Sequence, residues 1–152
     1  MTKSRVYVGV KWGLLTPTVM LTARYYPPLR DHIHIIREFY RKEVYLEDLI
    51  NIGQSWNKEL TIRKFFCDPA EPMFIARLRK SRLWAVAVEQ EMNLARIMVK
   101  QRLHKWRQQS PGGLSASPEC PMIAAQFPKY HMLEAKRGQP ARGQVKTLKS
   151  VQ

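Results

Sequence analysis

Hydrophobic and polar residues alternate in the N-terminal part of the chain in a pattern typical of β-strands. Valine occupies every second position between Val6 and Val10, within the stretch Arg5 to Lys11, which is the period of a half-buried strand. The stretches Thr18 to Tyr26 and His32 to Arg41 are also rich in β-branched and aromatic residues. Glycine, proline and threonine residues that favour turns separate the three stretches. The pattern therefore predicts three antiparallel strands joined by hairpins.

The pattern changes to a helical period after the third of these strands, and then alternates between helices and strands. We expect helices over Tyr45 to about Asn57, Glu71 to Lys80 and Glu91 to Trp106, strands over Leu60 to Cys67 and Leu83 to Val88, a loop over Ser110 to Pro118 and a short helix over Pro121 to Gln126. Three strands followed by this alternation form the element order of the ribonuclease H-like fold. We therefore predict an α/β protein with a mixed sheet, antiparallel in its first three strands and flanked by helices. Such an order defines a fold class and no function.

Length and composition favour one domain with a basic tail. The chain has 152 residues, of which 45% are hydrophobic, enough for a single packed core. From about Leu133 onward, large apolar residues become scarce and positive charge dominates. We expect a domain over residues 1–132 and a disordered basic tail over residues 133–152.

Net charge restricts the classes of partner. Lysine and arginine together number 26 against 12 acidic residues, a net charge of +14. This excess favours a polyanion, nucleic acid first, although a basic surface exposed only to solvent remains an alternative.

No run approaches the roughly 18 apolar residues of a membrane span, and the N-terminus lacks the features of a signal peptide. We expect a cytoplasmic protein that does not bind membranes, with Cys67 and Cys120 as reduced thiols.

Two stretches resemble one protein family. These are YVGVKWGLLTPTVML, Tyr7 to Leu21, and FFCDPAEPMFIARLRK, Phe65 to Lys80. They resemble the nuclease domain of the large terminase subunit of tailed bacteriophages, and the stretch His34 to Ile50 is similar as well. In that family the first strand ends in a Gly-Val-Asp-Trp-Gly-like motif. The fourth strand ends in an Asp-Pro-Ala-Glu-Pro-like motif, and a helix follows it.

The resemblance implies a metal-dependent DNA endonuclease that cuts viral DNA during packaging. Carboxylates at the ends of the first and fourth strands and in a C-terminal Asp-His-x-x-Asp-Ala-like helix would hold two Mg²⁺ or Mn²⁺ ions about 3.5–4 Å apart. Asp68 matches the fourth-strand carboxylate, so we expect it to be the metal-binding and catalytic residue. The partners implied are double-stranded DNA and, in the packaging machinery, the terminase ATPase domain, the small terminase subunit and the portal protein.

This sequence departs from the family pattern at the other carboxylates. Lys11 stands where the first aspartate is expected, and no aspartate follows Asp68. Glu71 is a weak second candidate for the metal, because at the start of a helix it can instead interact with the helix dipole. We therefore expect impaired catalysis. The alternative is a basic DNA-binding module without catalysis, or a prophage gene remnant.

Three interpretations of Lys11 remain open. It is a lesion in a decaying prophage gene, or a replacement that puts an ammonium in the place of a metal cation and next to Asp68, or a surface lysine that the alignment misplaces. The sequence also lacks the GxxxxGK[ST] phosphate loop of the terminase motor. We therefore expect a separated domain or a gene fragment that does not drive packaging alone.

Basic and aromatic residues occur together in two further stretches. We expect Arg77, Arg79 and Lys80 to contact the DNA backbone. The stretches Lys80 to Trp84 and Lys100 to Gln109 combine cations with tryptophan, which fits either a phosphate-tracking surface with base stacking or an amphipathic helix packed on the core. An RNA-binding protein is a third possibility that rests on charge alone. His32 and His34 alternate on one strand and fit a half-exposed strand face better than a metal pair.

Overall fold

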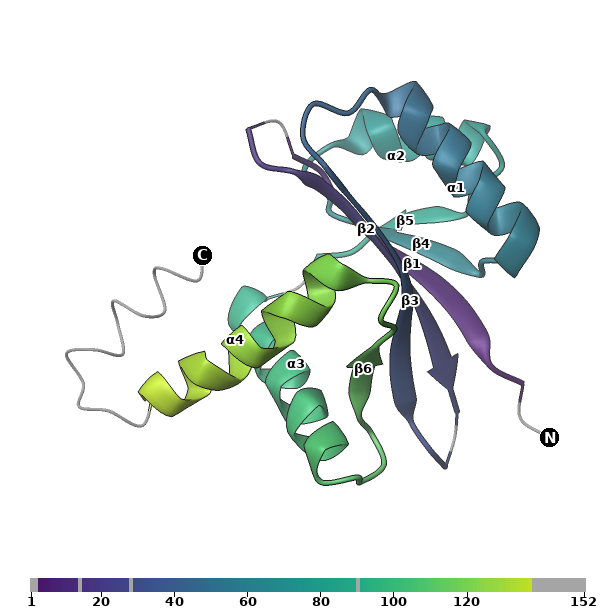
Figure 1. The fold of residues 1–152 in the computed structure, drawn as a ribbon. Coiled ribbons are helices and arrows are strands. Elements are labelled where there is room, and N and C mark those ends of the chain that lie inside the picture. Colours follow the sequence, from purple (N-terminus) through teal and green to yellow (C-terminus); the bar gives the residue numbers. More distant parts are fainter. Residues whose placement is uncertain (1–2, 14, 28, 90, 138–152) are drawn as a thin grey trace.

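The structure, a computed structural model, describes residues 3–13, 15–27, 29–89 and 91–137. Its centre is a six-stranded mixed sheet with the strand order β5-β4-β1-β2-β3-β6, flanked by helices on both faces (Figure 1). The strands are β1 (Arg5–Lys11), β2 (Thr18–Tyr26), β3 (His32–Arg41), β4 (Lys64–Cys67), β5 (Ala85–Ala87) and β6 (Leu114–Ala116). The helices are α1 (Leu46–Leu60), α2 (Pro72–Lys80), α3 (Met92–Arg107) and α4 (Pro121–Arg137). The predicted α/β class is confirmed.

Strands β1, β2 and β3 form the predicted antiparallel meander. Val8 pairs with Thr22, and Met20 pairs with Phe39. The register between β2 and β3 shifts after Thr22, which inserts one unpaired residue and bends the strand. Strands β4 and β5 continue the sheet beyond β1 in parallel pairing, and β6 pairs in parallel with the outer side of β3.

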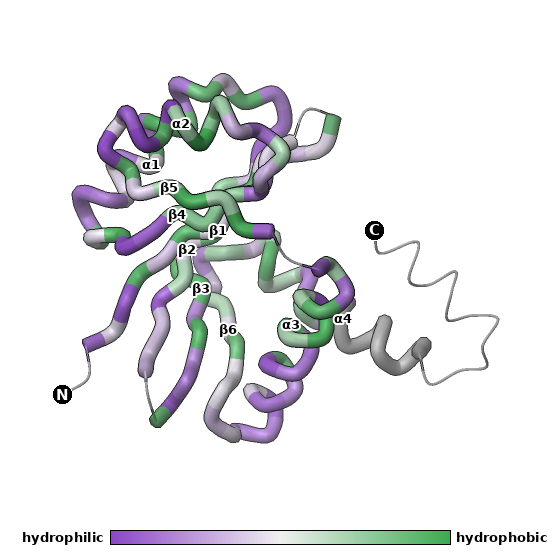
Figure 2. The backbone as a smooth tube through the Cα atoms, turned by 180° about the vertical axis from the view of Figure 1, so that it is seen from behind, coloured by the Kyte–Doolittle hydropathy of each residue, from purple (hydrophilic) through white to green (hydrophobic). Residues whose placement is uncertain are grey.

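Alternation along β1 and β4 directs one side of the sheet toward the main core. Val8 is fully buried, and its partner Phe65 on β4 is only 1% exposed. Their side chains pack with Leu49 of α1 and Leu78 of α2, so α1 and α2 cover this face. Burial of several large apolar side chains is the main favourable term for such an arrangement. The tube in Figure 2 shows hydrophobic positions gathered in the central strands.

A second, smaller core lies on the opposite face, between the sheet and the helices α3 and α4. Ile35 of β3 and Leu114 of β6 pack there against Leu103 of α3 and Cys120, which precedes α4. Among the described residues, the strand members of this cluster come from β2, β3 and β6. On the same face, the neighbouring half formed by β1, β4 and β5 presents exposed residues, among them Gly9, Lys11 and Phe66.

Several predicted boundaries differ from the structure; β5, for example, is limited to Ala85–Ala87. Strand β6 lies inside the expected loop Ser110 to Pro118, because it is three residues long and is defined by pairing with β3 rather than by its own pattern. Helix α1 continues to Leu60 and ends at Thr61, whose φ of 54° is left-handed, so β4 begins only at Lys64. Helix α4 extends beyond the expected Gln126 to Arg137.

Helix α4 therefore crosses position 132, where we expected the domain to end. The rest of the predicted basic tail, residues 138–152, lies outside the described residues. Within the described ranges, no helix is long and apolar enough to span a bilayer.

Substitution of Phe65 tests the main core. Phe65→Ala should lower the free energy of unfolding by about 3–5 kcal/mol, because it leaves a cavity beneath α1 and α2. Phe66→Ala at the next residue, whose side chain is 38% exposed, should cost about 1 kcal/mol. Urea denaturation followed by circular dichroism measures both. Equal losses for the two variants would contradict the assignment of the strand faces.

Candidate functional site

Lys11 and Asp68 follow two paired residues at the ends of neighbouring strands. Val10 of β1 is the register partner of Cys67 of β4, and the Asp68 amide donates a hydrogen bond to the Val10 carbonyl (2.9 Å). Because side chains alternate along paired strands, Lys11 and Asp68 both belong to the sheet face opposite the main core. The structure thus brings together Asp68 and Lys11, the two residues that the resemblance singles out, while a metal role for Asp68 and a lost ligand at Lys11 stay predictions.

The backbone around Asp68 is held in place from two sides. The indole Nε1 of Trp12 donates to the Asp68 carbonyl oxygen at 2.9 Å, and the Trp12 ring packs edge-on against Phe74 of α2. The Asp68 carboxylate Oδ1 accepts from the Ala70 amide at 3.0 Å. One carboxylate oxygen therefore stabilises the turn that leads to α2, as aspartate does in Asx-turns.

Glu71 occupies the N-cap position of α2. Its carbonyl oxygen accepts hydrogen bonds from the Phe74 and Ile75 amides, while its side chain makes no capping hydrogen bond. Its position at the helix start is as predicted, and an interaction of its carboxylate with the helix dipole stays a prediction. A metal role for Glu71 stays a prediction.

The donor set at these strand ends does not fit a two-metal centre. Within the described part of the chain, no group of three or more His, Cys, Asp or Glu side chains is arranged to hold a metal ion. Two hard divalent cations need several oxygen ligands, whereas Lys11 places a positive charge at one of these strand ends. The three ion pairs between described residues do not include Lys11 with Asp68.

The three predicted DNA contacts lie on the last turn of α2, which covers the opposite face of the sheet. Arg77 forms an ion pair with Glu47, and the Arg79 Nε donates to the Ala85 carbonyl at 2.7 Å. Both arginines therefore link α2 to neighbouring elements. Lys80 is exposed. Contact of these residues with DNA stays a prediction.

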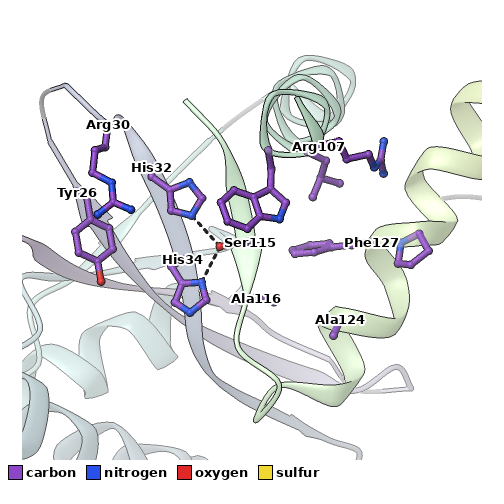
Figure 3. Close-up of a pocket in the computed structure, with 12 residues that line it drawn as sticks. Tyr26, Arg30, His32, His34, Arg107, Ser115, Ala116, Ala124 and Phe127 are labelled. Carbon is purple, nitrogen blue, oxygen red and sulfur yellow. Dashed lines mark hydrogen bonds between the residues drawn. The ribbon is translucent and has the colours of Figure 1, made fainter. Parts of the chain in front are cut away.

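A cluster of two histidines and a serine lies at the other end of the sheet (Figure 3). His32 Nε2 and His34 Nδ1 each lie 2.7 Å from the Ser115 Oγ. The ring of Trp106 lies 4.9 Å from the His32 ring, and both line a cavity of about 710 Å³ between β3, β6, α3 and α4. Sequence patterns carry no signal for Ser115, because only the β3–β6 register places it beside His34.

Both histidines of this cluster favour the neutral form. Burial lowers the pKa of His32, and the nearby His34, Arg30 and Arg102 lower it further. Burial and Arg24 lower the pKa of His34 in the same direction. A neutral pair allows the serine hydroxyl to donate to one ring nitrogen and accept from the other. The cluster is therefore a hydrogen-bonded link between β3 and β6.

The two cysteines are free and buried. Burial raises the pKa of the Cys67 thiol to about 12 and also raises that of Cys120. Since the thiolate is the reactive form, neither is a nucleophile at neutral pH.

Solved structures that match this fold include phage large terminases. The Mn-bound nuclease domain of the large terminase from bacteriophage SPP1 matches with a TM-score of 0.57 and 18% identity, over 84% of this chain and 68% of that one. The large terminase of a thermophilic bacteriophage gives 0.64 and 14%, over 81% and 30%. The P22 large terminase nuclease domain gives 0.61 and 8%, over 82% and 67%. No protein-family model and no curated protein matches the sequence.

The chain therefore has the ribonuclease H-like fold of phage large terminase nuclease domains, as predicted. It spans about two thirds of the SPP1 and P22 nuclease domains and less than a third of the large terminase from the thermophilic phage.

The histidine cluster predicts a loss of stability in mild acid. The unfolded chain takes up protons at histidine near pH 6.5, whereas folded His32 and His34 have lower pKa values. Their contribution is present above about pH 6.5 and is lost as pH falls from there toward the folded pKa values. The melting temperature, followed by circular dichroism from pH 7.5 to 5, should therefore decrease. The double variant His32→Gln, His34→Gln should show a smaller decrease.

The matched control is His104→Gln, since His104 is exposed on α3. It should retain the full decrease. An unchanged decrease in the double variant would assign the acid sensitivity to other groups.

Proposed function

We propose that this chain is a terminase nuclease-type domain that binds DNA and is impaired in DNA cleavage. The observation that carries the proposal is the β1–β4 register, which sets Lys11 beside Asp68 at the strand ends. In the resembling family, the carboxylates of a two-metal nuclease occupy these strand ends. In this chain, Lys11 places a cation at one of these strand ends.

The charge at Lys11 supports loss of metal binding. At about 4 Å and an effective dielectric constant of about 20, two unit charges interact by about 4 kcal/mol. An ammonium at the same distance from a divalent ion repels it by about twice that energy, and removal of a ligand weakens binding further. No aspartate follows Asp68 in this sequence, so within it the family's C-terminal aspartate motif has no match. A single carboxylate at this site does not support two-metal hydrolysis.

The basic surface supports the DNA-binding part of the proposal. A net charge of +14 favours binding to the phosphate backbone by release of counterions, without sequence preference. Lys80, exposed at the end of α2, is the best placed of the three predicted backbone contacts. By resemblance, the DNA would be viral DNA in the cytoplasm of a bacterial host, handled together with an ATPase domain, a small terminase subunit and a portal protein.

A plasmid-nicking assay tests the cleavage part. In Mn²⁺ the purified chain should leave supercoiled plasmid intact, because Asp68 lacks partner ligands for the metal. Gel electrophoresis measures the product. Nicking by the wild-type chain that disappears in Asp68→Asn would overturn the proposal and show that other residues complete a metal site.

The variant Lys11→Asp separates two causes of the impairment. Recovery of nicking in this variant would assign the loss to the cation alone. Intact plasmid with both chains would assign it also to the missing C-terminal carboxylates.

Salt-dependent binding to duplex DNA tests the DNA-binding part of the proposal. The logarithm of the affinity, measured by fluorescence anisotropy, should fall linearly with the logarithm of the salt concentration. Lys80→Gln should reduce that slope by about 0.9, the amount expected for one lost phosphate contact. Lys129→Gln on α4 is the control, and equal changes in the two slopes would remove Lys80 from the interface.

A further inference from the structure

One half of the sheet carries an open groove on the face that α3 and α4 leave uncovered. The groove has a volume of about 840 Å³. It is lined by the centre of the sheet, by β4 and by the segments that lead into β4 and β5, among them Tyr7, Gly9, Arg63, Lys64, Phe66 and Trp84. Figure 1 shows α3 and α4 beside β3 and β6, away from β4 and β5.

Aromatic rings line this groove and remain accessible. Tyr7 of β1 and Phe66 of β4 are stacked, with ring centroids 5.5 Å apart and planes inclined by 29°. The Trp84 side chain is 67% exposed and that of Phe66 is 38% exposed. A gathering of large exposed rings on one face marks an interaction surface in a folded protein.

The charges of the groove are positive. Lys64 places its Nζ 5.9 Å from the centre of the Trp84 ring, and Arg63 beside it is exposed. Among the described residues that line the groove, none is aspartate or glutamate. Asp31, which accepts a hydrogen bond from the Tyr25 hydroxyl, is already paired with Arg102. The groove thus matches a ligand that carries negative charge and flat apolar surfaces.

A glycine keeps the centre of the groove open. Gly9 lies in the middle of β1, opposite Phe66, and a methyl group added there would meet no atom within 4 Å. Its backbone is ordinary strand, so no turn requires a glycine at this position. Glycine inside a strand weakens it and often marks the close approach of a ligand or another backbone.

We propose that this groove binds unpaired nucleotides of a single-stranded nucleic acid. Bases stack on Trp84 and on the Tyr7–Phe66 pair, while Lys64 and Arg63 contact the phosphates. Aromatic platforms beside cations are the common solution for binding single strands without sequence preference. A duplex does not offer its base faces, because they are stacked on one another. The inference goes beyond the proposed duplex binding, and it holds whether or not Asp68 binds a metal.

The test is fluorescence anisotropy with a labelled oligothymidylate of about 15 nucleotides. The wild-type chain should bind it, and an unlabelled duplex of equal length should compete poorly for the same site. Trp84→Leu keeps apolar volume and removes the ring, and it should weaken binding at least about fivefold, as expected for one lost stacking partner. Tyr45→Leu is the matched control, since Tyr45 is a 79% exposed aromatic at the N-cap of α1 and should have no effect.

Two further variants separate stacking from charge and from folding. Lys64→Gln should reduce the salt dependence of binding, with a slope change of about 0.7, whereas Trp84→Leu should leave the slope unchanged. Gly9→Val should preserve or raise the melting temperature, because valine favours strands, and should weaken oligonucleotide binding by filling the groove. An oligouridylate of the same length distinguishes RNA from DNA as the ligand.

Three results would overturn the inference. These are equal losses in Trp84→Leu and Tyr45→Leu, full competition by duplex DNA, and unchanged binding by Gly9→Val. Self-association that is abolished by Gly9→Val, measured by sedimentation velocity, would assign the groove to a second copy of the chain instead. Failure of duplex binding leaves this test intact, so the two proposals can fail separately.

Discussion

The parallel pairing of β1 with β4 is the constraint on which the rest of the structure depends. It joins the N-terminal meander to the second half of the chain and buries Val8 against Phe65 at the centre of the main core. The same register places Lys11 and Asp68 at neighbouring strand ends. Because side chains alternate with a period of two, a slip by one residue would turn Val8 out of the core and move Lys11 to the opposite face. Core packing therefore fixes the geometry of the candidate site.

The two faces of the sheet have different roles. Helices α1 and α2 cover one face over β1, β4 and their neighbours, and the exposed Lys80 lies at the end of α2. On the other face, the described residues of α3 and α4 pack against β2, β3 and β6. The uncovered half carries both Lys11 and the aromatic groove. The candidate site at the ends of β1 and β4 and the aromatic groove therefore share one side of the sheet.

The strong local patterns of the sequence were sufficient for much of the fold. The bounds predicted for Arg5–Lys11, Thr18–Tyr26 and His32–Arg41 agree with β1, β2 and β3, since each has its own β-pattern and turn signals. Strand β6 was missed, because its three residues become a strand only by pairing with β3. The predicted helix over Pro121 to Gln126 was also too short. Helix α4 continues past Pro128, a residue that usually ends a helix in a local pattern. The sites show the same limit: motifs identify Asp68 and Lys11, whereas the groove of Tyr7, Phe66 and Trp84 exists only through the sheet register.

The most direct measurement is the binding of Mn²⁺ by isothermal titration calorimetry, with the wild-type chain and the Lys11→Asp variant side by side. The account predicts no saturable site in the wild-type chain and a gain of Mn²⁺ binding in Lys11→Asp, because the variant replaces a repelling cation with a second carboxylate next to Asp68. A stoichiometric Mn²⁺ site in the wild-type chain that Asp68→Asn abolishes would contradict it.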